Sequence, residues 1–202
     1  MGDLFCGRGG ATKGFQAHGW ECWGIDLYPQ PLYPGRFIQA DIAQLIELPY
    51  ADFYWCSSPC EQFSIFQMKM FHKSPKYPFF GLNLFQYAKY LLENTGKPYI
   101  MENVRAAQDF VGRSTNHCGP FHMWGNSVPA IFPAELYKVK KGIDLGSGIK
   151  LKGMTQEEKR LYRKQFPNMQ VSGISKERAE YTSKWAEIPQ EIAEYISLSL
   201  QA

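Results

Sequence analysis

The stretch DLFCGRGGATKGF, residues 3–15, decides the fold of this chain. Its apolar start is typical of the end of a short strand, and the glycines that follow predict a loop that enters a helix near Ala11, which ends at Gly19. Glycine lets the backbone approach a ligand closely. A tight turn without a ligand would need fewer glycines than the four in residues 7–14, so the stretch favours a strand, a binding loop and a helix.

Strands and helices alternate along the first hundred residues. Continuously apolar or β-rich segments predict strands at residues 20–27, 37–42, 51–57 and 98–101. Apolar residues at helical spacing predict a helix over 82–95. Beyond Pro120 the pattern weakens, although a helix is expected at 155–167 and another, with an isoleucine face, from Pro189 onward. The alternation is typical of an α/β protein with a mostly parallel, doubly wound sheet.

Acidic residues mark the carboxyl ends of two predicted strands. In a parallel sheet these ends meet at one edge, where ligands bind. Asp26 ends the second strand, where it can accept hydrogen bonds from ribose hydroxyls, and Asp41 ends the third, where it can accept from an adenine amino group. A dinucleotide-binding loop would place a glycine at position 12, where this chain has Thr12, so a dinucleotide site is the less favoured alternative.

Cys60 and Glu102 follow two further strands. Taken alone, Cys60 after Pro59 would more often be a small buried thiol, and Glu102 a surface residue. Together they suit chemistry on a cytosine ring. A thiolate that adds to C6 makes C5 nucleophilic enough to take a methyl group from a sulfonium, and a carboxylic acid at N3 neutralises the charge that develops. In a duplex the base must first leave the stack.

Three motifs resemble those of the cytosine-C5 DNA methyltransferase family, in the family's order and spacing. They are DLFCGRGGATKGF (3–15), SSPCEQFS (57–64) and MENV (101–104), and they cover about the first half of the chain. The resemblance implies a Rossmann-like, S-adenosylmethionine-dependent methyltransferase fold. It also implies transfer of a methyl group from S-adenosylmethionine to C5 of cytosine in DNA through a covalent Cys60–C6 adduct, with S-adenosylhomocysteine as the second product.

The resemblance implies roles for individual residues. Cys60 is the expected nucleophile, Glu102 is expected at cytosine N3, and Asn103 would support the geometry around Glu102. Either Arg105 or Arg113 would take the place of the family's substrate-orienting arginine. The expected cofactor contacts are Phe5, Cys6, Gly7, Gly9, Gly10, Asp26, Leu27, Asp41, Ile42 and Pro59. The segment after Cys60 would be a loop that closes over the substrate.

The chain departs from the family pattern in several places. Glu61 follows the cysteine where the family has glutamine, and a carboxylate close to the thiol would raise the thiol's pKa. No Gln-x-Arg-x-Arg motif follows MENV. GNSVP (125–129) resembles a late family motif but lies far from the C-terminus, whereas IPQEIAEYI (188–196) lies at the expected place without the Gly-Asn start. GNSVP is therefore treated as a decoy, and residues 118–124 as a loop near the substrate or a packed segment.

The second half of the chain is short for this family. A single methyltransferase domain over residues 1–202 is expected, with residues 130–187 as a small basic substrate-recognition insertion. Residues 138–164 carry nine Lys and Arg residues against three acidic ones. Such a stretch suits contact with phosphates, although a solvated surface explains it equally well. The expected partner is DNA with a flipped cytosine, with relaxed sequence specificity or a protein partner that supplies the specificity.

Cysteine use and hydropathy bear on the cellular compartment. The five cysteines are odd in number and show no Cys-x-x-Cys spacing, which argues against a disulfide framework and a zinc site. No signal peptide or long apolar run supports export or membrane insertion. The expected location is the cytoplasm of a bacterial or phage-infected cell, because compact modification enzymes suit phages and mobile elements.

Two alternatives stay open at this point. The motifs do not separate DNA from RNA or a free cytosine nucleotide as the substrate, because a flipped base looks alike in each. Glu61 and the missing arginine motif also suit a non-catalytic nucleic-acid-binding protein that retains an S-adenosylmethionine pocket.

Overall fold

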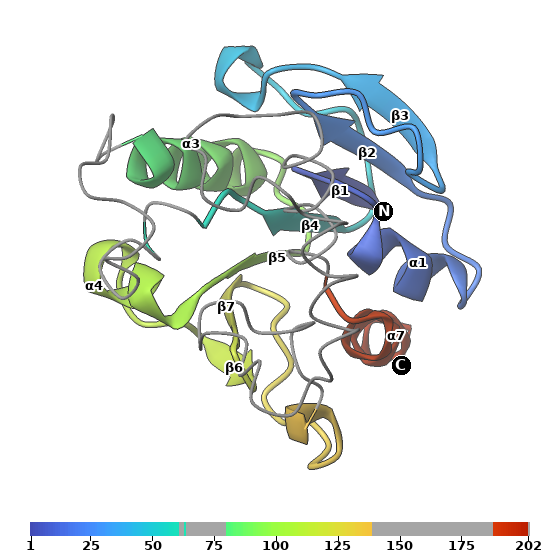
Figure 1. Cartoon of the computed structure of the whole chain (residues 1–202), viewed down its shortest axis with the longest axis vertical. Helices are drawn as coiled ribbons and strands as arrows, with labels where there is room; N and C mark the ends of the chain where they lie inside the picture. The colour runs from blue at the N-terminus through green and yellow to red at the C-terminus, as the bar shows by residue number, and fades with distance from the viewer. Residues whose placement is uncertain (61–62, 64–79, 139–187, 202) are drawn as a thin grey trace, which may run out of the picture.

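The computed structural model describes residues 1–60, 63, 80–138 and 188–201. These residues form one sheet with the strand order β3-β2-β1-β4-β5-β7-β6 (Figure 1). The first five strands are parallel, whereas β7 runs antiparallel to both β5 and β6. The strands are β1 (Gly2–Leu4), β2 (Trp23–Asp26), β3 (Arg36–Gln39), β4 (Tyr54–Ser57), β5 (Tyr99–Asn103), β6 (Asn116–Cys118) and β7 (Phe121–Gly125). The predicted mostly parallel sheet is confirmed.

Helices cover both faces of this sheet. Figure 1 shows α1 (Gly10–Gln16) and α7 (Gln190–Ser199) on one face, and α3 (Phe80–Asn94) and α4 (Gln108–Val111) on the other. Short 3₁₀ turns complete the described part, namely η1 (Ile42–Gln44), η2 (Arg105–Ala107) and η3 (Leu136–Lys138). The doubly wound arrangement predicted from the alternation of strands and helices is therefore also confirmed.

The sequence of β4 explains why both faces are covered. Successive side chains of a strand point to opposite faces, and here the first three, Tyr54, Trp55 and Cys56, are all apolar. Trp55 packs into the core beneath α1 and α7, whereas Tyr54 and Cys56 pack into the core beneath α3. All three side chains are almost completely buried. A strand of this kind is stable only in the middle of a sheet with helices above and below it.

The C-terminal helix α7 packs directly against α1. Its isoleucine face is buried as predicted, with Ile188, Ile192 and Ile196 all inside the core. The contact is close because Gly14 of α1 has no side chain. A Cβ atom at that position would lie 2.5 Å from the Cβ atom of Ala193 and 2.8 Å from the carbonyl oxygen of Gln190. Gly14 is therefore the residue that brings the last helix against the first.

Replacing Gly14 with leucine is expected to lower the free energy of unfolding by about 3 kcal/mol, because the new side chain overpacks a helix contact that involves backbone atoms. Ala17→Leu, at the exposed end of the same helix, is the matched control and should change stability by less than about 0.5 kcal/mol. Chemical denaturation followed by circular dichroism compares the two. Equal stability of both variants would contradict the packing of α7 on α1.

One local prediction was wrong, and for a second segment the structure decides between the two alternatives. The third strand was expected to run to residue 42, but it ends at Gln39, and Asp41 instead caps η1 by accepting a hydrogen bond from the Ala43 N–H at 2.9 Å. An aspartate that bonds the backbone two residues ahead favours a turn over a strand. Of the two alternatives for residues 118–124, the packed segment is confirmed, because Phe121, His122, Met123 and Trp124 are buried. Most of the segment is strand, and its last three residues pair with β5.

GNSVP lies at the opposite edge of the sheet from Cys60 and Glu102. It begins at Gly125, the last residue of β7, and because β7 is antiparallel to β5 it reaches the amino end of β5. There the Asn126 side chain accepts a hydrogen bond from the Tyr99 N–H at 2.8 Å and donates one to the Lys97 carbonyl at 3.2 Å. The motif is a structural corner. The predicted helix at 155–167 and most of the basic region, from residue 139 to 187, lie outside the described residues.

Candidate active site

Cys60 and Glu102 follow adjacent parallel strands. The register of β4 and β5 places Ser57 beside Glu102, and Cys60 comes three residues after Ser57. Glu102 is buried, with 4% of its surface exposed, while Cys60 is partly exposed. The predicted edge of the sheet thus does bring the turn that carries the thiol next to the strand that carries the acid. Glu61 and the rest of the loop expected to close over the substrate, apart from Phe63, lie outside the described residues.

Asn103 ties these two strand ends together. Its amide nitrogen donates to the Ser58 carbonyl at 3.0 Å and lies 3.1 Å from the Ser58 hydroxyl oxygen. Its amide oxygen accepts from the Val104 N–H at 2.9 Å. Asn103 is fully buried, so these bonds are protected from water. The side chain therefore holds the Ser58-Pro59-Cys60 turn in position relative to Glu102.

The other four cysteines are poor nucleophiles. Burial raises the pKa of the Cys22 and Cys118 thiols to about 11, and it raises the pKa of the Cys6 and Cys56 thiols further. The thiolate is the nucleophilic form of cysteine, so these four stay protonated and unreactive near neutral pH. Cys60 is the described cysteine that lies at the carboxyl edge of the sheet beyond β4.

The glycine loop curls around the end of β2. Phe5, Gly7 and Gly9 have positive φ values of 58°, 48° and 75°, which bend the chain sharply between β1 and α1. The Gly7 N–H donates to one oxygen of Asp26 at 3.0 Å, and the Tyr28 N–H donates to the other at 3.1 Å. Each carboxylate oxygen has a second lone pair, so Asp26 can hold the loop and still accept from ribose hydroxyls. These residues fit a nucleoside ligand.

The remaining expected cofactor residues differ in how they could contact a ligand. Leu27 is 49% exposed and Asp41 is partly exposed, so both side chains are accessible. Ile42 and Cys6 are buried, and the Cys6 backbone N–H and carbonyl already bond Ile25 and Gly9. The backbone N–H of Cys6 is therefore not available to donate a hydrogen bond to a cofactor.

A buried chain of three polar side chains lies beneath the glycine loop, and sequence reasoning missed it. Thr12 donates to an Asp3 carboxyl oxygen at 2.6 Å and bonds the Tyr33 hydroxyl at 2.8 Å. Because the threonine hydroxyl has one proton, Tyr33 is the donor in the second bond. Burial, together with the charge of Asp26, raises the pKa of Asp3 to about 8. The sequence did hold one indication of this polar chain. Thr12 stands where a dinucleotide-binding loop would have glycine, and a hydroxyl buried there requires hydrogen-bond partners.

Replacing Asp3 with asparagine is expected to flatten the pH dependence of stability between about pH 4 and pH 8. Unfolded aspartate loses its proton near pH 3.8, whereas folded Asp3 keeps its proton until about pH 8. The folded protein binds the extra proton in this window, so the free energy of unfolding falls as pH rises through it. Asparagine cannot titrate but still accepts from Thr12. Urea denaturation near both ends of the window measures the effect, and equal pH slopes in the two proteins would contradict it.

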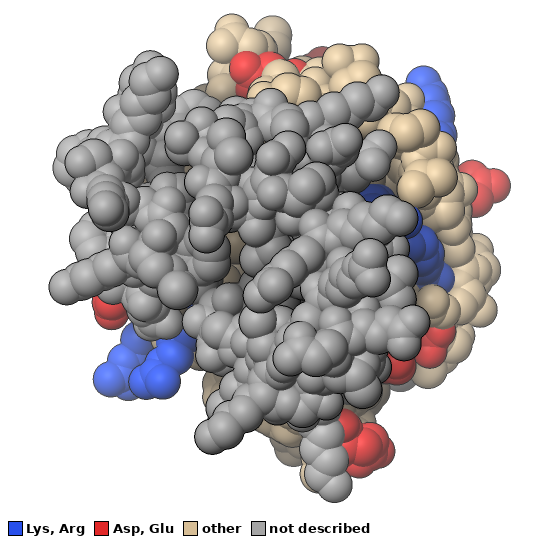
Figure 2. All heavy atoms as spheres, viewed as in Figure 1, with Lys and Arg blue, Asp and Glu red and all other residues tan. Residues whose placement is uncertain are grey.

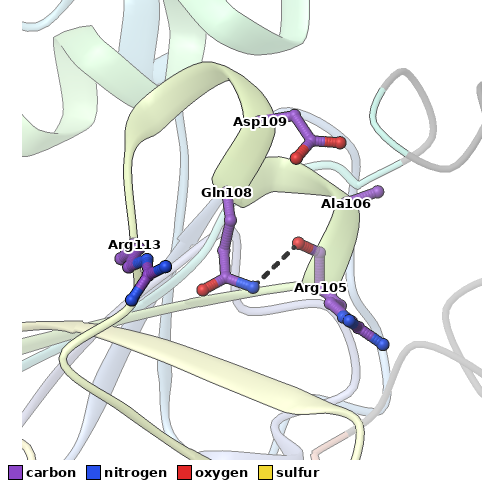
Figure 3. A pocket seen from close by; sticks show the side chains of 5 residues that line it. All are labelled: Arg105, Ala106, Gln108, Asp109 and Arg113. Carbon is purple, nitrogen blue, oxygen red and sulfur yellow. Dashed lines mark hydrogen bonds between the residues drawn. The ribbon is translucent and has the colours of Figure 1, made fainter.

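Arg105 and Arg113, the two candidates for the missing arginine motif, line the same cavity on the α4 side of the sheet (Figure 3). Figure 2 shows basic side chains on the surface at the lower left, near the position of α4 in Figure 1. Next to them His122 bonds the Ser114 hydroxyl at 3.0 Å. Burial, followed by the charges of His117 and Arg105, lowers the pKa of His122 to about 4. The positive charge of Arg105 therefore reaches His122 on β7, the strand that pairs with β5 and Glu102.

Two further findings concern metals and membranes. In residues 1–60, 63, 80–138 and 188–201, His, Cys, Asp and Glu side chains do not gather in threes in a way that could hold a metal ion. Within the same ranges no helix combines the length and the apolar character needed to cross a membrane.

Comparison with known proteins adds one positive finding. A protein-family model described as C-5 cytosine-specific DNA methylase matches residues 1–118. The match begins at β1 and ends with β6, so it includes the glycine loop, Cys60, Glu102 and Asn103. No curated protein matches the chain.

Proposed function

Because the chain belongs to the C-5 cytosine-specific DNA methylase family, we propose that it transfers a methyl group from S-adenosylmethionine to C5 of a cytosine in DNA. The observation that supports this most directly is the tie between the two strand ends. Asn103 bonds Ser58, and the β4–β5 register sets Glu102 beside Ser57. A thiol and a carboxyl group held in this way can act on opposite atoms of one pyrimidine ring.

The Cys60 thiolate would add to C6 of the cytosine, and the displaced π electrons would move toward N3, where Glu102 donates a proton or a strong hydrogen bond. C5 is then electron-rich. S-adenosylmethionine supplies an electrophilic methyl group on a sulfonium. After C5 has taken the methyl group, loss of the C5 proton to water restores the 5,6 double bond and expels the Cys60 thiolate. N3 returns its proton to Glu102, so the nucleophile and the acid are both regenerated. Asn103 contributes by holding the Cys60 turn.

The cofactor would bind at the carboxyl ends of β1, β2 and β4. Asp26 would accept hydrogen bonds from the ribose hydroxyls, and Asp41 from the adenine amino group. The backbone of the glycine loop would lie against the same ligand at Gly7, where a Cβ atom would meet nothing within 4 Å. The proposed cofactor contacts are the ten residues that the family resemblance implies, namely Phe5, Cys6, Gly7, Gly9, Gly10, Asp26, Leu27, Asp41, Ile42 and Pro59.

We propose Arg105 as the arginine that orients the cytosine. It follows Asn103 by two residues and is exposed at the end of β5, whereas Arg113 comes after α4 and is further from Glu102 along the chain. The cytosine would be flipped out of the duplex, because neither face of C6 is accessible in the stack. We further propose that the chain is a single methyltransferase domain with residues 130–187 as a basic insertion. Its sequence specificity would be relaxed or supplied by a protein partner. Its location would be the cytoplasm of a bacterial or phage-infected cell.

Transfer of tritium from methyl-labelled S-adenosylmethionine tests the function and the substrate together. Duplex DNA, single-stranded RNA and dCMP are offered in parallel, and the labelled product is digested to identify the base and atom. Label at C5 of cytosine from DNA alone is the expected result. Label in RNA or dCMP alone would replace the proposed substrate. Binding of S-adenosylhomocysteine and DNA without any transfer would favour a non-catalytic binding protein.

A further inference from the structure

An open cavity of about 540 Å³ lies beyond the carboxyl end of β5, the strand that carries Glu102. Its walls come from η2, α4 and the segment that leads to β6, which follow directly after Glu102 and Asn103 in the chain. Five residues line it, and Figure 3 shows the Gln108 side chain between the two arginines. They are Arg105, Ala106, Gln108, Asp109 and Arg113. The cavity is separate from the glycine loop, so the proposed cofactor does not account for it.

The charge of this cavity is positive. It holds two guanidinium groups against the single carboxylate of Asp109. Among the described residues, neither Arg105 nor Arg113 forms an ion pair, and both side chains are exposed. The planar guanidinium fork matches the oxygens of a phosphate group, which is the anion that arginine binds best at protein–nucleic acid interfaces. The cavity therefore suits a phosphate group.

The cavity is also held open by hydrogen bonds from its own walls. The Gln108 amide nitrogen donates to the Arg105 carbonyl at 3.3 Å, and its amide oxygen accepts from the Ser114 N–H at 3.2 Å. On the far side, Trp124 donates its indole N–H to the Gly112 carbonyl at 3.0 Å. These bonds fix the backbone on either side of Arg113. The backbone of the site therefore needs little rearrangement when it binds a ligand.

We propose that Arg113, in this cavity, binds a backbone phosphate of the nucleic acid strand close to the target nucleotide, while Arg105, on the other side of Gln108, keeps its proposed contact with the cytosine. The inference rests on the proposed function, since it assumes a nucleic acid at the neighbouring active site. A phosphate contact positions the strand without reading its sequence. It would hold the backbone while the base enters the space between Cys60 and Glu102, and it would act alongside any contacts from other parts of the chain.

Arg113→Ala tests the inference, because Arg113 lines the cavity without following Glu102 directly. The affinity for a duplex oligonucleotide with S-adenosylhomocysteine is measured over a range of potassium chloride concentrations. We expect a loss of about tenfold at constant salt and a salt slope that is shallower by about 1, because one phosphate contact is lost. Arg36→Ala is the matched control, since Arg36 is exposed at the amino end of β3, on the far side of the sheet. It should leave both quantities unchanged.

Oligonucleotides with single methylphosphonate substitutions identify the phosphate. A neutral linkage at one position near the target cytosine should weaken binding by the wild type and have no further effect on Arg113→Ala. If the two losses add at every position, or if the salt slope of Arg113→Ala equals that of the wild type, the cavity binds no phosphate. The results separate this proposal from the proposed function. If the wild type methylates DNA and Arg113→Ala binds DNA with the same affinity and salt slope as the wild type, only the phosphate site is overturned. A wild type that does not modify cytosine overturns the proposed function whatever the slope.

Discussion

Cys60→Ser is expected to reduce methyl transfer to DNA by more than about 1,000-fold, because a serine hydroxyl stays protonated near neutral pH and does not add to C6. The change is small in volume, and the turn that carries residue 60 is held by Asn103 through the Ser58 carbonyl. Binding of DNA and S-adenosylhomocysteine should therefore persist. Initial rates with labelled S-adenosylmethionine measure the first effect, and calorimetry measures the second.

Duplex DNA that contains 5-fluorocytosine gives a second measurement of the same residue. Fluorine at C5 cannot leave as a proton would, so a working thiolate forms an adduct that survives SDS electrophoresis. The wild type should form this adduct and Cys60→Ser should not. Cys22→Ser is the matched control, because the Cys22 thiol has a pKa near 11 and lies on the loop before β2. An adduct that persists in Cys60→Ser, or disappears in Cys22→Ser, would assign the nucleophile elsewhere.

Glu102→Gln is expected to lower the turnover number by about 100- to 10,000-fold, which is the usual contribution of a positioned acid. Glutamine has almost the same shape, so the buried site stays filled, and its amide can donate a hydrogen bond to N3. It cannot transfer a proton, so the charge that develops when Cys60 adds is less well neutralised. The affinity for S-adenosylhomocysteine should be unchanged. Glu102 lies on β5, which is separated in the sheet from β2 and Asp26 by β1 and β4.

The control for this variant is Glu93→Gln on α3. Glu93 is exposed and pairs with Lys89 at 3.6 Å, so its loss should change neither turnover nor stability appreciably. Thermal unfolding of Glu102→Gln distinguishes a chemical defect from misfolding. A turnover number close to that of the wild type would show that another group stabilises the charge at N3.

The sequence predicted the parts of this protein that depend on neighbouring residues. The glycines after Leu4, the continuous apolar run in β4 and the order of the three motifs are local patterns, because backbone conformation and strand formation are set over a few residues. The general rule that parallel strands bind ligands at their carboxyl ends then placed Cys60 and Glu102 at one edge. The described structure confirms that edge through the register of β4 and β5.

Only the tertiary structure decided the features that join distant residues. The sequence predicted that Asn103 supports the geometry around Glu102, and the structure adds that its side chain bonds Ser58, 45 residues away. The β6–β7 hairpin was missed, because its pairing with β5 and burial of Phe121 and Met123 stabilise strands too short to predict from propensity.

The same reasoning applies to the buried polar chain and to the cavity. Thr12 bonds Tyr33 across 21 residues, and Arg105 and Arg113 line one cavity because Gln108 bonds the backbone of both Arg105 and Ser114. No local pattern encodes such contacts, since they exist only after burial has excluded water and each polar group must find a partner within the fold. The sequence by itself thus determined which chemical groups the protein has at its sheet edge. The packing of that sheet decided which of them hold one another in place.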